Sequence, residues 1–155
     1  MHYFELYTEF LADKRLQGVT PSTLKHYDDT VNHFFAWCRQ EKIELYEIAL
    51  LPRWGKIWLT NCAERGLRPY TVHTYGRGLR TFLNWLVRQG HLEGPLQFIC
   101  PPAPRSHVIP LEQKHLKRII QLFEADRSIR GLRNYCILRL FCETGMRKSE
   151  MAGIC

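Results

Sequence analysis

Apolar residues recur at helical spacing through the first 90 residues of the chain, in four separate segments. The pattern predicts helices over roughly residues 3–16, 21–39, 52–64 and 69–89. Each segment carries aromatic or aliphatic residues three or four positions apart, as expected of a stripe that faces a core. No stretch in these residues alternates between apolar and polar positions, which is the pattern of a half-buried strand. The first 90 residues are therefore predicted to form an all-α unit.

Two of the predicted helices begin alike, which suggests a pair of similar helical hairpins. Pro21 and Pro69 each stand at a helix start, where the fixed φ of proline suits the first helical position. Both helices end in an aromatic-rich tail, and two crossed hairpins would bury the two tails in one core. Gly76 and Gly78 lie inside the second of these helices, where each costs about 1 kcal/mol relative to alanine. We therefore expect close packing against these glycines.

The composition of the chain changes between residues 91 and 110, because this stretch contains most of its prolines. This composition precludes regular secondary structure and predicts a linker. Two further helices are predicted over about 111–124 and 130–143, and the second of them is apolar on nearly every side, as in a helix buried in a larger domain. We therefore divide the chain into an all-α unit at residues 1–90, a linker at 91–110 and the opening helices of a second domain at 111–155.

The composition is that of a globular protein with an excess of positive charge. Hydrophobic residues make up 45% of the chain, and the formal net charge is +7. Such a charge favours a polyanionic partner, most often nucleic acid. No apolar run is long enough to cross a bilayer and no secretory signal is present, so we expect a cytoplasmic protein. The six cysteines form no Cys-x-x-Cys pair and no histidine stands near them at metal-ligand spacing, so we expect neither a metal nor another cofactor.

The positive charge is concentrated in two stretches. Residues 66–92 carry arginines and no acid, and residues 101–118 carry basic residues against Glu112 alone. On the predicted helix 69–89, hydrogen-bond donors follow one stripe opposite the apolar face: His73, Arg77, Arg80, Asn84 and Arg88. A helix that is merely exposed usually mixes charges of both signs. The distribution therefore favours a nucleic-acid surface, with solvated outer charges as the alternative.

A short motif near the end of the sequence carries a candidate catalytic pair. Thr144-Gly145 ends an apolar helical run, and a new helical pattern starts at once with Arg147 in its first turn. A cation at a helix N-terminus lies at the unfavourable end of the macrodipole, so Arg147 does not serve helix stability. Glu150, three residues on, can hold the guanidinium in place. A positioned, permanent charge suits a phosphodiester in a transition state, although an ordinary surface ion pair is the alternative.

This motif and the helix before it resemble the first catalytic box of the tyrosine recombinases, the phage-type integrases. In that family the box usually reads T-G-hydrophobic-R-x-S-E. Arg147 matches the arginine that clamps the scissile phosphate, and Glu150 matches the acid that braces it. Lys148 and Gly153 depart from the apolar residues that are common there, which leaves the packing after the box open. The rest of the chain is also similar to the family layout: a four-helix, SAM-like core-binding domain, a Pro-rich basic linker and the start of the catalytic domain.

The resemblance also implies which residues bind DNA. In this family the second and fourth helices of the core-binding domain face the duplex, and the linker passes along its backbone. The residues implied on the second helix are Ser22, Thr23, Lys25 and His26. Those on the fourth helix are Tyr70, His73, Thr74, Arg77 and Arg80, and those on the linker side are Arg105 and Lys114.

The resemblance further implies that the remaining catalytic parts, including the nucleophilic tyrosine, would lie beyond Cys155. None of the tyrosines present stands in the family's nucleophile context, and covalent catalysis needs a nucleophile and a general acid. We therefore expect a truncated, N-terminal portion of a site-specific recombinase or integrase, which binds double-stranded DNA but does not cut it alone. The full-length protein would self-associate on DNA. Two alternatives stay open: a stand-alone DNA-binding protein without catalysis, and a helical protein-interaction module.

Overall fold

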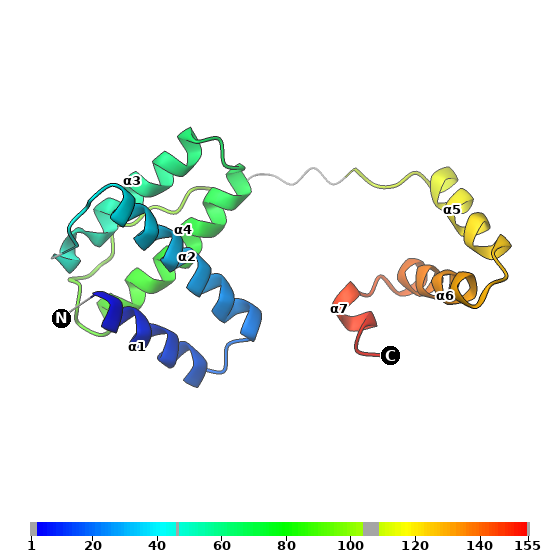
Figure 1. The fold of residues 1–155 in the computed structure, drawn as a ribbon, viewed down its shortest axis with the longest axis horizontal. Coiled ribbons are helices and arrows are strands. Elements are labelled where there is room, and N and C mark those ends of the chain that lie inside the picture. Colours follow the sequence, from blue (N-terminus) through cyan, green and yellow to red (C-terminus); the bar gives the residue numbers. More distant parts are fainter. Residues whose placement is uncertain (1–2, 46, 104–108, 155) are drawn as a thin grey trace. The chain divides into compact units, whose positions relative to one another are not determined.

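The structure is a computed structural model, and it describes residues 3–45, 47–103 and 109–154 (Figure 1). Every regular element within these ranges is a helix, so the predicted all-α class is confirmed. The contacts divide the chain into two compact units, residues 1–105 and 106–155. None of the helices in the described ranges is both long enough and apolar enough to cross a membrane.

The first unit contains four α-helices that agree closely with the predicted ones. Helix α1 covers Tyr3–Leu16, α2 covers Pro21–Gln40, α3 covers Leu51–Glu64 and α4 covers Pro69–Arg88. A 3₁₀ turn at Ile48–Leu50, η1, leads into α3. The apolar periodicity does not predict η1, because three residues are too few to show a period.

The helix ends follow the local sequence. Thr20 caps α2, because its Oγ1 accepts a hydrogen bond from the backbone nitrogen of Thr23 at 3.3 Å. Pro21 then occupies the first helical position, where its missing N–H costs nothing. Gly18 and Gly66 have left-handed φ angles of 69° and 80° just after α1 and α3, a conformation in which a Cβ is unfavourable. Each helical hairpin therefore turns at a glycine.

The core of the first unit is built from the aromatic tails of α2 and α4 together with α1. Phe35 of α2 meets Phe82 of α4 edge to face, with ring centroids 6.2 Å apart. Phe10 of α1 contacts Phe82 at 5.2 Å and Trp85 at 5.7 Å in the same arrangement, which aromatic rings prefer. The prediction that the two tails share one core is confirmed.

Helices α2 and α4 come into close contact at Thr30 and Gly78. A Cβ placed on Gly78 would lie 2.7 Å from Oγ1 and 2.9 Å from Cγ2 of Thr30, well inside van der Waals contact. Thr30 is fully buried, and its Oγ1 has no hydrogen-bond partner among the residues that the structure describes. The expected close packing against a helix glycine is therefore present at Gly78.

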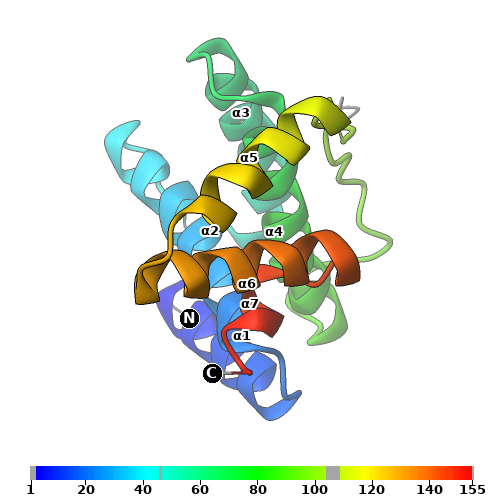
Figure 2. The ribbon, with the colours of Figure 1, turned by 90° about the vertical axis from the view of Figure 1, so that its right-hand side faces the viewer.

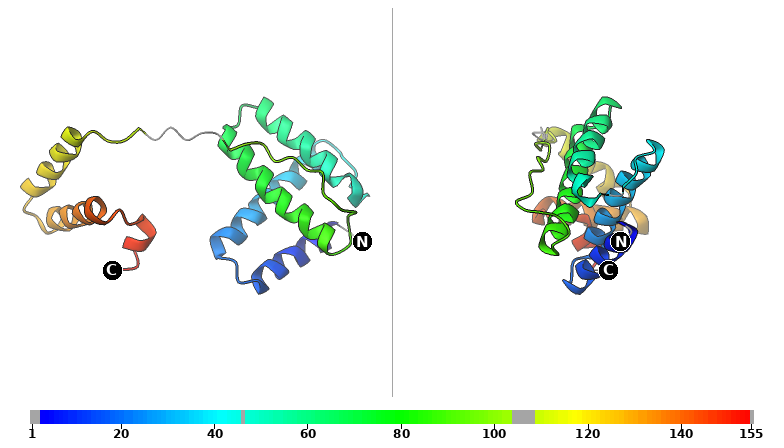
Figure 3. Two further views of the ribbon diagram at one scale, coloured as in Figure 1. Left: turned by 180° about the vertical axis from the view of Figure 1, so that it is seen from behind. Right: turned by 90° about the vertical axis from the view of Figure 1, so that its left-hand side faces the viewer.

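Residues 92–101, which we call the strap, pack on the first unit although they fall in the predicted linker. Leu92 and Phe98 are buried. A Cβ on Gly55 of α3 would lie 3.1 Å from Cε2 of Phe98, so the phenyl ring sits directly on that helix. Figure 3 shows the strap in yellow-green, running back along the first unit after α4. The prolines exclude regular secondary structure here, as predicted, but they do not exclude packing.

The second unit consists of α5 at Gln113–Ala125, α6 at Ile129–Thr144 and the short α7 at Lys148–Met151 (Figure 2). Helices α5 and α6 pack on each other. Apart from Gly131, no residue of α6 is buried, and Leu132 and Leu140 are exposed. The helix predicted to be apolar all round therefore exposes much of its apolar surface.

We expect Gly78→Ala to destabilise the first unit, because the added Cβ would overlap Thr30. Overpacking of this kind costs about 1–3 kcal/mol, and the better helix propensity of alanine recovers about 1 kcal/mol of it. Urea unfolding followed by circular dichroism measures the net effect.

The matched variant is Thr30→Val, which keeps the shape of the side chain and removes the unpartnered hydroxyl. A buried unsatisfied polar group costs about 1–3 kcal/mol, so this variant should be at least as stable as the parent. If Gly78→Ala is instead more stable than the parent by about the 1 kcal/mol that alanine adds in helix propensity, α2 and α4 do not touch at this point.

Candidate nucleic-acid interface

A groove with a volume of about 290 Å³ lies between the N-terminal halves of α2 and α4. Its lining residues are Ser22, Thr23, His26 and Tyr27 from α2 and Tyr70, Thr74, Arg77 and Thr81 from α4. All of these except Tyr27 and Thr81 belong to the DNA-binding set implied by the family resemblance. The fold therefore brings together residues from two helices that are about 50 positions apart in the chain.

The crossing of α2 and α4 explains why these residues meet. The two helices touch at Thr30 and Gly78, near the middle of each helix. Both helix starts lie on the same side of that crossing (Figure 1). The C-terminal halves carry the aromatic tails and close into the core, so the polar N-terminal halves are left to form the walls of the groove.

Exposed polar groups line the α2 wall of the groove. The hydroxyls of Ser22 and Thr23 lie 3.1 Å and 2.9 Å from Oγ1 of the capping residue Thr20. On the α4 wall, Thr74 and Thr81 donate to the backbone carbonyls of Tyr70 and Arg77, one turn back along the helix. These internal bonds leave hydroxyl lone pairs on α4 and rotatable hydroxyls on α2 for an incoming ligand.

Arg77 supplies the charge of the groove. Its side chain is exposed and forms no ion pair among the described residues, and no acid lines the groove. Burial lowers the pKa of His26 below its ordinary value of 6.5; the positive charge of Arg77 lowers it further, and Asp29 partly opposes both effects. The imidazole of His26 is therefore neutral at pH 7, with one donor and one acceptor nitrogen.

Tyr70 stands out among the groove residues because its side chain is 68% exposed. An aromatic ring left this far open on a polar wall suits stacking or packing against a ligand that enters the groove.

Five residues of the predicted DNA-binding set lie outside the groove. Lys25 and Arg80 are exposed on α2 and α4. The ring of His73 is bonded to the strap, with Nδ1 2.6 Å from the carbonyl oxygen of Pro101. Lys114 belongs to the second unit and pairs with Glu112 at 2.6 Å. Arg105 lies outside the described residues.

Sequence reasoning missed Tyr27 and Thr81. Helical spacing places Thr81 one turn beyond Arg77, and Tyr27 one turn beyond Thr23, so both could have been found from their neighbours. The apolar residues around Tyr27 indicate a position in the core, and its ring centroid does lie 5.7 Å from that of Phe10. Tyr27 therefore contributes both to the core and to the lining of the groove.

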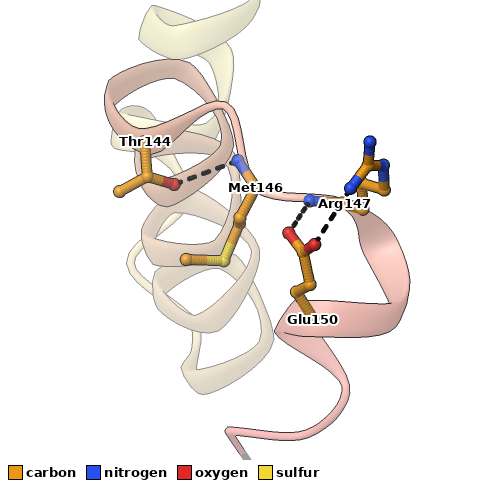
Figure 4. A network of polar contacts seen from close by, with 4 residues as sticks. All are labelled: Thr144, Met146, Arg147 and Glu150. Carbon is orange, nitrogen blue, oxygen red and sulfur yellow. Dashed lines mark hydrogen bonds and ion pairs between the residues drawn. The ribbon is translucent and has the colours of Figure 1, made fainter.

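The candidate catalytic pair lies in the second unit (Figure 4). Oε2 of Glu150 accepts from the backbone nitrogen of Arg147 at 2.7 Å, and Oε1 accepts from Nη1 of the Arg147 guanidinium at 3.3 Å. Arg147 precedes α7 as its N-cap residue and does not lie in its first turn, which corrects the predicted position. A guanidinium has no acceptor, so only the glutamate half of a capping box forms.

The turn before α7 also explains the Thr-Gly pair of the motif. Gly145 ends α6 with a left-handed φ of 65°. Oγ1 of Thr144 accepts from the backbone nitrogen of Met146 at 3.3 Å (Figure 4). The side chain of Arg147 is 84% exposed, so the guanidinium donors that Glu150 does not use are accessible.

Comparison with known proteins gives the family of the chain. Residues 2–96, which span α1 to α4 and half of the strap, match the model of the phage integrase SAM-like domain. The chain belongs to this family. The resemblance to tyrosine recombinases that the sequence suggested is thereby confirmed, and so is the SAM-like class of the helical unit.

Curated relatives of the chain are tyrosine recombinases named XerC. The protein from Bacillus subtilis is 27% identical over 155 residues, which cover 99% of this chain and 50% of the relative. Those from Psychromonas ingrahamii and Xylella fastidiosa are 25% and 27% identical over 153 and 150 residues, covering 49% and 47% of the relatives. The chain thus spans about half the length of the curated relatives it matches. No solved structure gives a significant match.

We expect the pKa of His26 to lie below 6.5 in the parent protein and to rise in Arg77→Ala, because that change removes a positive charge that acts on the imidazole. An NMR titration of the histidine ring resonances measures both values.

Arg39→Ala is the matched control, since it removes an exposed charge from the opposite end of α2. It should leave the pKa of His26 unchanged. An identical His26 pKa in the parent and in Arg77→Ala would mean that the two side chains do not share the groove.

Proposed function

We propose that this chain is the DNA-binding, N-terminal portion of a site-specific tyrosine recombinase, and that the groove between α2 and α4 receives the backbone of double-stranded DNA. The observation that carries the proposal is the groove itself. It joins six residues of the implied DNA-binding set, one of which is an arginine with no ion-pair partner in the described ranges. The relatives' name, tyrosine recombinase, supports the same function.

The electrostatics support a polyanion as the ligand of this surface. The chain has a net charge of +7, and α4 contains arginines but no acid. Neither Arg77 nor Arg80 is neutralised by an ion pair within the described residues. Each phosphate that such a side chain neutralises releases counterions, so binding should weaken steeply as salt rises.

The groove residues suit different parts of a duplex. Arg77 matches a phosphate in charge and geometry. The hydroxyls of Ser22 and Thr23, beside the N-terminus of α2, suit phosphate oxygens, because free N–H groups and the helix dipole favour negative charge there. Tyr70 and Lys25 are exposed nearby and can reach sugar or base edges. We assign Arg80 to phosphate beside the groove.

The domain organisation that we propose follows from the packing. Residues 1 to about 101, including the strap, form the DNA-binding unit, because Leu92 and Phe98 close its core. The unit at 106–155 corresponds to the start of the catalytic domain. This assignment moves the end of the DNA-binding unit beyond residue 90, where the sequence pattern placed it.

We further propose that Arg147 clamps the scissile phosphate in a complete recombinase and that Glu150 holds it in place. The pair leaves most of the guanidinium accessible, as a phosphate ligand requires. One arginine polarises a phosphate but provides neither nucleophile nor general acid. Strand cleavage through a phosphotyrosine, and self-association on DNA, are therefore assigned only to a recombinase that also supplies those groups.

The double variant Arg77→Ala, Arg80→Ala should bind a duplex more weakly and with a shallower dependence on salt. Each lost phosphate contact lowers the slope of log K against log[salt] by about one unit, so the slope should fall by about two. Fluorescence anisotropy at several salt concentrations measures it, and circular dichroism should show unchanged helix content.

The control is Arg39→Ala, Arg65→Ala, which removes the same charge from exposed positions at the ends of α2 and α3. It should keep a slope close to that of the parent. Parental binding by Arg77→Ala, Arg80→Ala at every salt concentration would exclude α4 from the DNA-facing surface, and binding that ignores salt altogether would favour a protein-interaction module.

In a cleavage-competent recombinase that contains these residues, Arg147→Ala should abolish strand cleavage while duplex binding stays nearly intact. Removing one preorganised donor to a transition-state oxyanion costs about 100- to 1,000-fold in rate. A suicide-substrate cleavage assay reports the rate.

Arg139→Ala is the comparison variant, because it breaks an exposed ion pair with Glu143 in α6 and leaves the proposed clamp in place. It should cleave normally. If Arg147→Ala cleaves as fast as Arg139→Ala, the pair of Arg147 and Glu150 is an ordinary surface ion pair.

A further inference from the structure

The strap is joined to α4 through His73, a residue that the family resemblance assigned to DNA. Nδ1 of His73 lies 2.6 Å from the carbonyl oxygen of Pro101. A carbonyl can only accept, so Nδ1 carries the proton and donates this bond. In the opposite direction, the thiol of Cys100 donates to the backbone carbonyl of His73 at 3.6 Å. Two hydrogen bonds thus connect residue 73 with the end of the strap.

The same end of the strap lies directly on the backbone of α4. A Cβ on Gly76, one turn beyond His73, would be 2.8 Å from Cδ of Pro101 and 2.9 Å from Sγ of Cys100. Only a residue without a side chain allows this approach. Gly76 and His73 therefore form one contact site, which we call the seat, for residues 100–101. The buried side chains of Leu92 and Phe98 hold the rest of the strap on the first unit.

This seat lies beside the arginines proposed to contact DNA. Arg77 directly follows Gly76 on α4, and Arg80 lies one turn beyond it, so both arginines adjoin the helix positions that residues 100–101 contact. Burial raises the pKa of the Cys100 thiol, and the charges of Arg80 and Arg77 oppose that rise. The strap therefore runs back from the C-terminal end of α4, and residues 100–101 lie against the N-terminal half of that helix (Figure 3).

We propose that His73 is a positioning residue, which anchors the strap through Pro101 and so sets the point, beside Arg77 and Arg80, from which the chain continues toward the second unit. Its role is to place that continuation next to the duplex and not to contact DNA through its own ring. The consequence for DNA rests on the proposed function, whereas the anchoring is a property of the free protein. A tethered start keeps the following residues at a high effective concentration near the duplex.

Hydrogen exchange of the free 155-residue chain, followed by mass spectrometry, tests the anchoring. His73→Ala should raise the exchange rate of strap amides in residues 96–100 by about twofold to tenfold, the range expected for one lost hydrogen bond. His73→Asn, whose amide nitrogen can take the place of Nδ1, should restore the exchange rate of the parent. Gly76→Ala should speed the strap amides as His73→Ala does, while the amides of α2 stay protected in all three variants.

Thr74→Ala is the matched control, because Thr74 adjoins His73 on α4 but faces the groove. It should leave strap exchange unchanged. Parental strap exchange in both His73→Ala and Gly76→Ala would overturn the anchoring role, even if every variant binds DNA normally.

Duplex binding by the same variants tests the consequence for DNA. His73→Ala and Gly76→Ala should weaken binding to the same extent, and His73→Asn should bind as the parent does. If His73→Ala weakens binding while Gly76→Ala and strap exchange match the parent, His73 contacts DNA directly and the proposal is wrong. If the parent chain binds no duplex, the proposed function fails, and the exchange experiment still decides whether His73 anchors the strap.

Discussion

The contact between Thr30 and Gly78 is the constraint on which the first unit depends. It brings the middles of α2 and α4 together with only the small side chain of Thr30 packed against Gly78. Because the helices cross there, their C-terminal halves can pack aromatic residues against each other, as Phe35 and Phe82 do. Their N-terminal halves lie on the other side of the crossing and form the polar groove. One close approach thus separates a core from a polar groove on the same two helices.

Hydrogen bonds from α1 to α4 and to α2 stabilise the packing of these two helices. The indole nitrogen of Trp85 and the amide of Gln89 donate to Oδ2 of Asp13 at 2.8 Å and 3.2 Å, which ties α1 to the end of α4. The hydroxyl of Tyr7 donates to Oδ1 of Asp28, which ties α1 to α2. Burial and the neighbouring carboxylate raise the pKa of Tyr7, so its proton stays in this bond at any physiological pH. The crossing angle of α2 and α4 is thereby supported by a third helix.

Apolar periodicity predicted the helices and their shared core, because each helix buries a stripe that repeats with its own period. Family resemblance, and not helical spacing, indicated that Ser22, Arg77 and their neighbours face the same ligand. Spacing along one helix cannot predict which other helix lies opposite it. The proline content of the strap predicts a linker, because proline excludes regular secondary structure. The burial of Phe98 cannot be predicted in this way, because it depends on a surface formed by residues distant in the sequence. His73 shares a stripe with Arg77, and only the position of Pro101 separates their roles.

The central claim is that duplex DNA enters the groove between the N-terminal halves of α2 and α4. An NMR titration of the ¹⁵N-labelled chain with a short duplex at low salt tests it most directly, because every amide reports at once. If DNA enters the groove, the largest chemical-shift changes should fall in residues 22–27 and 70–81, while the amides of α3 keep their positions. Changes centred on α3 and on the C-terminal half of α2, with the groove unaffected, would contradict it.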